Sequence, residues 1–290
     1  MLVEAVIFLS LLFLAAASVF DIKSGEIPEA SSVGHLAVVL CLAALASFMA
    51  RSLNPLLFCA MLSAAYFIVG YIFFALGQWG GGDVKVIAAV GGSLALVSEL
   101  GYPFNSMHLF PPTVAYFLNM GFISIPYVAL YGLTLGLAHR QVFDRFVVFL
   151  KKTENILLFV LSWLPVAAAY IMHLRAIAAV YALLPAFLLL TLYLKAVEVE
   201  ALRKKIPTKS LVEGDVLVDA FTVGNVTLGG NGIEGLSKED ASRLKKWATE
   251  GKIPAHVTVK WGIKFVPIFL LAYAVTLLYG NLLERILLLL

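Results

Sequence analysis

Two aspartates stand where a very apolar sequence meets charged residues. Asp21 follows the first apolar run, in SVFDIKSGEIP (18–28), and Asp83 precedes a later one, in GGGDVKVI (80–87). An ionisable residue at a membrane span is costly to place and usually serves function. Two carboxylates that come close share one proton, so the ionised member can take a proton from water while the protonated member stabilises the oxyanion of a scissile carbonyl. The pair therefore predicts peptide hydrolysis without a metal or a covalent intermediate.

The glycines before Asp83 suit this chemistry. Gly80, Gly81 and Gly82 remove side chains in front of the carboxylate and weaken the start of the following helix. An extended peptide backbone could then approach the carboxylate closely. The alternative is a flexible loop that leads to an aspartate at a helix N-terminus, where a negative charge is stabilised.

The whole chain has the composition of an all-α polytopic membrane protein. Its 290 residues are 61% hydrophobic and 13% charged, whereas soluble domains carry about 25% charged residues. We predict about eight transmembrane helices, because eight apolar runs are near the length that crosses a bilayer. The sixth and seventh runs are also compatible with a re-entrant hairpin. The expected spans are 2–20, 33–50, 56–76, 84–100, 113–137, 156–173, 177–194 and 264–280.

Lysine and arginine indicate the orientation of these spans. With the N-terminus outside, 18 of the 21 Lys and Arg residues lie in or beside cytoplasmic loops, as the positive-inside rule requires. The first and fourth spans then place Asp21 and Asp83 at the same cytoplasmic depth. We predict a multi-pass plasma-membrane protein whose site faces the cytoplasm. The net charge of +3 reflects this topology and not nucleic-acid binding.

Three regions follow from the distribution of polar residues. Residues 1–194 are predicted to form a membrane body that carries the site. Residues 195–263 are predicted to form a small cytoplasmic α+β module, and 264–290 the last transmembrane helix and tail. The basic amphipathic segment 137–155 is expected either to lie along the inner leaflet or to continue the fifth span.

Within the module, the sequence predicts helix and strands in alternation. The segment KAVEVEALRKKIP (195–207) is expected to continue the seventh helix, and the valine-rich stretch 210–232 to form short strands. Residues 235–252 are predicted to form a helix capped by Ser237, and HVTVKWG (256–262) a last strand. The predicted apolar face of the helix comprises Leu236, Leu244 and Trp247.

The residues of other intramembrane proteases are missing from the sequence. There is no HExxH motif for zinc and no GxSxG nucleophile motif. Cys41 and Cys59 both fall in predicted spans without a CxxC pair, so separate core residues are favoured over a disulfide. We expect neither a metal nor a cofactor.

The first aspartate motif resembles that of the type IV prepilin peptidases, which are membrane aspartyl proteases of the GxGD class. In that family an aspartate at the end of the first helix is followed by a Gly-x-Ile-Pro turn. Asp21, Gly25 and Pro28 match this pattern in FDIKSGEIP (20–28).

The second family motif is GxGD, usually followed by x-Lys. Gly80, Gly82 and Asp83 match it, with Gly81 at the variable place and Lys85 after it. The resemblance implies that Asp21 and Asp83 are the catalytic pair, and that the matched glycines, Pro28 and Lys85 support the site or bind substrate.

The remainder of the chain resembles the archaeal branch, the prepilin and preflagellin (archaellin) peptidases. The similar stretches are VEGDVL (212–217), GLSKED (235–240) and VKWGIKFVPIFLLAY (259–273). The resemblance implies removal of a short basic leader from pilin-like or archaellin precursors on the cytoplasmic side. The zinc-binding insert and methyl transfer of bacterial members are not expected, because their cysteines are missing here.

Several residues near the aspartates have more than one interpretation. Lys85 could tune the charge of Asp83, bind a lipid phosphate, or simply snorkel to the interface. Glu26 and Glu29 could attract the basic leader or only face water. Trp79 could line a substrate groove or anchor the chain at the membrane interface.

Two other functions stay open. Paired acids near a membrane face also serve proton- or cation-coupled transporters, although such sites favour the bilayer midplane and inverted repeats, which the sequence does not show. A catalytically silent filament-assembly protein that docks through its basic module is the other alternative.

Overall fold

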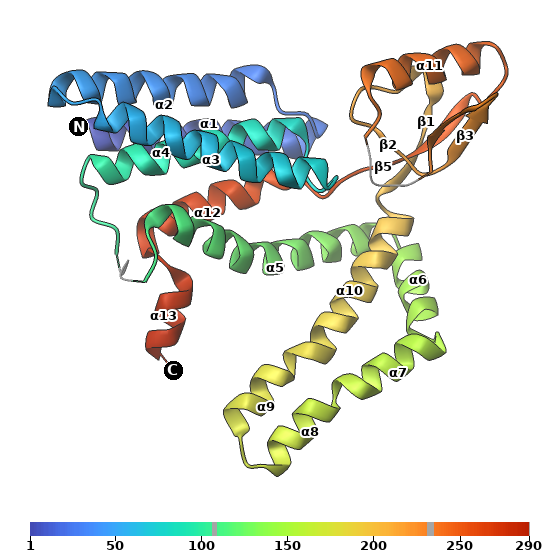
Figure 1. Ribbon diagram of the computed structural model, residues 1–290. Helices are drawn as coiled ribbons and strands as arrows, with labels where there is room; N and C mark the ends of the chain where they lie inside the picture. Colours follow the sequence, from blue (N-terminus) through green and yellow to red (C-terminus); the bar gives the residue numbers. More distant parts are fainter. Residues whose placement is uncertain (106–108, 231–234, 290) are drawn as a thin grey trace. The chain divides into compact units, whose positions relative to one another are not determined.

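The computed structural model describes residues 1–105, 109–230 and 235–289 (Figure 1). The chain folds as two compact units. The first comprises Met1–Tyr127 and Gly262–Leu290, and the second comprises Val128–Trp261. The boundary expected between residues 194 and 195 lies inside helix α10 (Leu183–Glu200).

Seven helices in the described part of the chain are long and apolar enough to cross a bilayer, which confirms a polytopic membrane protein. The eighth expected span is instead the helix α12 (Val266–Tyr279), whose 14 residues extend only about 21 Å at 1.5 Å per residue. The seven spans are Leu2–Ser24, Glu29–Ala50, Asn54–Ala75, Gly81–Glu99, Pro112–Ala138, Thr153–Ile171 and Arg175–Glu200.

The first unit is a bundle built around α4 (Figure 1). In α4, 72% of the most apolar window is buried, against at most 28% in the other six spans. The unit contains α1 (Leu2–Ser24), α2 (Glu29–Ala50), α3 (Asn54–Ala75), α4 (Gly81–Glu99), the first part of α5 (Pro112–Ala138), α12 (Val266–Tyr279) and α13 (Leu282–Leu289).

Small residues let α4 lie close to α3. A Cβ atom built on Gly91 would lie 2.8 Å from the Leu62 carbonyl oxygen, and one on Gly92 would lie 3.1 Å from Sγ of Cys59. Close backbone approach through small residues is a common way for membrane helices to associate, since apolar burial alone gains little in lipid. Cys41 and Cys59 are both free thiols; Cys59 is a buried core residue as expected, whereas Cys41 is exposed, so the expectation of a core position is wrong for Cys41.

A buried chain of hydroxyl groups joins α1, α4 and α12. Oγ of Ser10 lies 2.7 Å from Oγ of Ser93, which in turn lies 2.6 Å from the hydroxyl of Tyr273. All three side chains are fully buried. These hydrogen bonds connect α1, α4 and α12 inside the bundle, although the three helices are far apart in the sequence.

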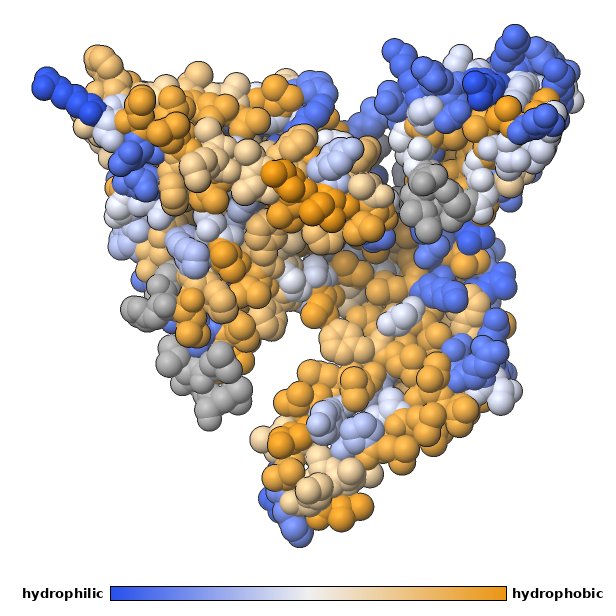
Figure 2. Space-filling view, viewed as in Figure 1, coloured by the Kyte–Doolittle hydropathy of each residue, from blue (hydrophilic) through white to orange (hydrophobic). Residues whose placement is uncertain are grey.

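The outward faces of the bundle are apolar, as a lipid-facing surface must be. Phe8, Phe48 and Ile68 are examples of strongly exposed apolar side chains on α1, α2 and α3. Figure 2 shows hydrophobic residues spread over the visible faces of α2 and α3.

The membrane part of the second unit contains the end of α5 and five further helices, α6 to α10. α5 ends at Ala138 and a separate basic helix begins at Gln141, so the segment 137–155 does not continue the fifth span. This helix, α6, packs on α10, where Nε of Arg145 lies 2.6 Å from Oε1 of Glu200. The helices are α6 (Gln141–Leu150), α7 (Thr153–Ser162), α8 (Leu164–Ile171), α9 (Arg175–Tyr181) and α10 (Leu183–Glu200).

The same unit carries the predicted α+β module. A three-stranded antiparallel sheet has the order β1-β5-β2, and β3 and β4 form a separate hairpin. The elements are β1 (Arg203–Pro207), the short 3-10 helix η1 (Thr208–Ser210), β2 (Val216–Leu217), β3 (Ala220–Val223), β4 (Val226–Gly229), α11 (Lys238–Thr249) and β5 (His256–Lys260).

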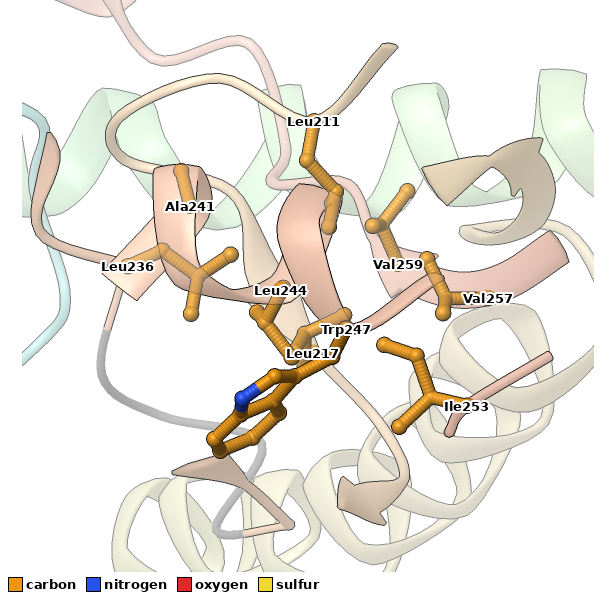
Figure 3. Packing of buried hydrophobic residues seen from close by; sticks show 9 residues of the cluster. All are labelled: Leu211, Leu217, Leu236, Ala241, Leu244, Trp247, Ile253, Val257 and Val259. Carbon is orange, nitrogen blue, oxygen red and sulfur yellow. The ribbon is translucent and has the colours of Figure 1, made fainter. Parts of the chain in front are cut away.

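The predicted module helix is confirmed. Ser237 caps α11 by accepting a hydrogen bond from the backbone N–H of Asp240 at 3.1 Å. Leu236, Leu244 and Trp247 are buried in one core with residues of the sheet (Figure 3).

The expectation that 195–207 is wholly helical is wrong. α10 ends at Glu200, and residues 203–207 form β1, which pairs with β5 along its length. The run Arg203-Lys204-Lys205 favours a helix locally, but pairing with β5 places Ile206 against the module core. Tertiary pairing thus overrides local propensity here.

Candidate active site

The first motif ends α1 and turns the chain into α2. Gly25 adopts the left-handed conformation with φ 77°, and its N–H donates to the carbonyl of Asp21 at 2.9 Å. Glycine is favoured here because a side chain would be strained. Pro28 then serves as the N-cap residue of α2, and its carbonyl accepts a hydrogen bond from the Ser31 N–H at 2.9 Å.

The carboxylate of Asp21 is buried at the start of α12. Its Oδ2 accepts a hydrogen bond from the backbone N–H of Val266 at 3.0 Å, and the side chain is only 7% exposed. The first N–H groups of a helix have no partner within the helix and favour a negative charge nearby. Asp21 thus supplies the cap that α12 lacks locally.

The carboxylate of Asp83 lies in the first turn of α4. Its Oδ2 accepts a hydrogen bond from the N–H of Gly80 at 2.8 Å, so the side chain bridges back over the motif that precedes it. The local arrangement expected for an aspartate at a helix N-terminus is therefore present. It fixes the orientation of the carboxylate and leaves the side chain partly exposed.

The structure brings the two predicted aspartates together in the first unit. The Asp83 carboxylate is near enough to that of Asp21 for their charges to interact, and Lys264 interacts with both. Three elements that are distant in sequence therefore meet at one place: the end of α1, the start of α4, and the start of α12.

The motif glycines differ in what surrounds them. A Cβ atom on Gly82 would lie 3.0–3.3 Å from the side chain of Ile27, so the two motifs pack directly against each other there. A Cβ on Gly80 would lie 3.5 Å from Oδ2 of Asp83, in ordinary contact with the carboxylate. A Cβ on Gly81 would meet nothing within 4 Å, which fits its variable place in the motif.

Lys85, two residues after Asp83 in α4, forms an ion pair with Glu29, the first residue of α2. Glu29 is therefore neutralised in this structure. Of the two loop acids considered for a basic leader, Glu26 is exposed and makes a local backbone turn with Ser24.

Trp79 packs inside the first unit and does not face lipid as an anchor. It is 8% exposed and lies against Phe73, Phe265 and Phe269, with ring centroids 4.6–5.8 Å apart. The aromatic cluster connects the end of α3 to the start of α12, and so supports the helix terminus that binds Asp21.

The contribution of α12 is the part of the site that the sequence analysis missed. Lys264 and Val266 lie in a stretch noted for its resemblance but given no role. A signal was available: Pro267 in the first turn marks a helix start, and a helix start close to a buried carboxylate is a natural partner for it.

Among the described residues, no three His, Cys, Asp or Glu side chains gather in a way that could hold a metal ion. The donor set at the two aspartates is two carboxylates, backbone N–H groups and one lysine.

Comparison with known proteins agrees with the motifs. Residues 8–139 match the type IV leader peptidase family. The chain is 30% identical over 149 residues to "Prepilin peptidase EppA" of Methanothermobacter thermautotrophicus, an alignment that covers 48% of this chain and 38% of that protein. No solved structure matches the chain.

The matched segment contains both aspartate motifs, most of α1 and the whole of α2, α3 and α4. The alignment with the Methanothermobacter protein covers well under half of that protein's length. The part of the chain that is similar to the type IV leader peptidase family, residues 8–139, thus includes both Asp21 and Asp83.

Proposed function

We propose that this membrane protein is an aspartyl endopeptidase in which Asp21 and Asp83 form the catalytic pair. One observation carries the proposal: α1 and α4 each deliver a motif carboxylate to the same place, close enough for the two charges to interact. Two carboxylates in such proximity favour a state that holds a single proton.

In the proposed reaction, a water molecule adds to the carbonyl carbon of the scissile peptide bond. The ionised aspartate takes a proton from this water, and the protonated aspartate gives its proton to the carbonyl oxygen. The tetrahedral intermediate then collapses, the C–N bond breaks, and a proton passes to the leaving nitrogen. The Gly80 N–H on Oδ2 of Asp83 orients that carboxylate for the transfer.

The proposed substrates are pilin-like or archaellin precursors that carry a short basic leader before an apolar segment. The relative named as a prepilin peptidase and the leader peptidase family both support this class. The apolar outer faces of α1–α3 suit an apolar segment that arrives through the lipid. The distribution of Lys and Arg favours cleavage on the cytoplasmic side.

The proposal is tested with purified protein and a pilin-like precursor. Cleavage should lower the mass of the precursor by that of its leader, and sequencing of the new N-terminus should place the cut just before the apolar segment. A second precursor, with the basic leader residues replaced by glutamine, controls for leader recognition and should be cut more slowly.

Failure of the folded protein to cut either precursor would count against the proposed function. Proton-coupled transport in liposomes would then become the leading alternative, since paired membrane carboxylates also serve that activity.

A further inference from the structure

Lys264 and Gly25 lie directly against each other, although they come from opposite ends of the chain. A Cβ atom built on Gly25 would collide with Nζ of Lys264. Gly25 therefore has two reasons to be glycine: its backbone has φ 77°, and a lysine side chain occupies the space where its own side chain would be.

The contact with Gly25 holds the ammonium of Lys264 beside the turn that follows Asp21. The ammonium interacts electrostatically with both Asp21 and Asp83. The lysine of the second motif, Lys85, forms its ion pair with Glu29. Lys264 is therefore a cation, within the described residues, whose charge acts on both members of the pair.

The backbone around Lys264 is fixed on both sides. The hydroxyl of Tyr127 donates to the carbonyl of Lys264 at 2.8 Å. Two residues later, the N–H of Val266 donates to Asp21 at 3.0 Å, and Phe265 packs on Trp79. The backbone that carries the Lys264 side chain is therefore held by the fold of the first unit.

We propose that Lys264 is a positioning residue of the site: its ammonium stabilises the singly protonated aspartate pair, and Gly25 leaves room for it. This inference rests on the proposed function. It assigns a role in the site to a residue outside both aspartate motifs and outside the segment that matches the family.

The role follows from the charge balance of the site. Two neighbouring carboxylates in a partly dehydrated place tend to become neutral, because each negative charge is poorly solvated and repels the other. A pair that is fully protonated has no base for the attacking water. One ammonium nearby offsets one negative charge, so that one aspartate stays ionised while its partner keeps the proton. Loss of the ammonium should reduce the rate constant kcat more than it changes KM.

A charge-restoration experiment separates this electrostatic role from simple packing. Lys264→Cys is made in a chain that also carries Cys41→Ser and Cys59→Ala, and the thiol is alkylated with either bromoethylamine or bromopropane. The first reagent rebuilds a side chain with the length and charge of lysine, and the second adds an equally long neutral one. The parent chain without the Lys264 change receives the same treatments as a control.

We expect the aminoethylated protein to regain nearly the parent's rate of leader cleavage. The propylated protein should stay slower in kcat by on the order of tenfold, which corresponds to a shift of about one pK unit in the equilibrium between charged and neutral forms. Equal rates for the two alkylated forms would overturn the role of the charge while leaving the peptidase assignment intact.

A second measurement tests the placement of Lys264 without relying on cleavage. The thermal stability of purified Gly25→Ala, Lys264→Ala and the double variant is compared with that of the wild type. The lysine side chain should account for part of the cost of Gly25→Ala, so the double variant should be more stable than the sum of the single changes predicts. Strictly additive effects would contradict the packing of Lys264 on Gly25, and a parent chain that cleaves no precursor would refute the proposed function instead.

Discussion

The carboxylate of Asp21 caps the N-terminus of a helix that begins 245 residues later, through the 3.0 Å hydrogen bond from the N–H of Val266. The bond joins the first and last parts of the first unit at the candidate site. A residue that appears in the sequence as an isolated acid at the end of a span therefore also organises the fold around the second aspartate.

This bond predicts that stability and activity respond differently to changes at residue 21. Asp21→Asn keeps an oxygen that can accept from Val266, whereas Asp21→Ala leaves a buried N–H without a partner. Asp21→Ala should lower the free energy of unfolding by about 1–2 kcal/mol more than Asp21→Asn does. Thermal unfolding in one detergent measures this difference, and equal stabilities of the two variants would contradict the capping role.

The contact between Gly82 and Ile27 predicts that substitutions at Gly82 and at the neighbouring Gly81 affect cleavage differently. Gly82→Ala forces Ile27 to shift by a few tenths of an ångström and should slow leader cleavage. Gly81→Ala is the matched control, because its Cβ would meet nothing, and it should cleave like the wild type. If Ile27→Ala restores activity to Gly82→Ala, the cause is this contact.

Gly80→Ala tests a different idea, that this glycine keeps the approach to the carboxylate open. Its added Cβ fits the resting structure, at 3.5 Å from Asp83, so the variant should fold with near wild-type stability. It should nevertheless raise KM, because an extended substrate backbone would meet the methyl group. Unchanged KM and kcat would show that substrate does not pass over Gly80.

The ion pair between Lys85 and Glu29 is exposed and should contribute little. Such surface pairs are worth about 0–1 kcal/mol, and both side chains here are more than a third exposed. Lys85→Gln should therefore change the unfolding temperature only slightly, and the exchange Lys85→Glu with Glu29→Lys should behave like the wild type. A large loss of cleavage in the exchanged protein would instead give Lys85 a direct role at Asp83.

The hydroxyl chain in the bundle makes a prediction about stability. Ser93→Ala removes the central hydroxyl, so the buried hydroxyls of Ser10 and Tyr273 both lose their hydrogen bond to it. The free energy of unfolding should fall by about 1–3 kcal/mol. Tyr273→Phe keeps the bond between Ser10 and Ser93 and should cost less. Chemical denaturation of the two variants gives the order, and the reverse order would show that Ser93 is not the central member.

The sequence was sufficient to single out Asp21 and Asp83, because the cost of placing acids at membrane spans makes them conspicuous; their catalytic role stays a prediction. It also predicted the helix capped by Ser237, where capping and apolar spacing act within a few residues. The strand at Arg203–Pro207 was missed, because its pairing with His256–Lys260 depends on residues 49 to 57 positions away. The contact of Lys264 with Gly25 was missed for the same reason, since nothing near Lys264 in sequence points to Gly25.

The central claim is that Asp21 and Asp83 work together as one peptidase site. The most direct measurement is leader cleavage by wild type, Asp21→Asn and Asp83→Asn, with Asp144→Asn as a control for loss of an exposed acid elsewhere. Thermal unfolding curves should first verify that all four purified proteins are folded. The account predicts cleavage by wild type and Asp144→Asn, and none by the other two. Full activity in either Asp21→Asn or Asp83→Asn would contradict it.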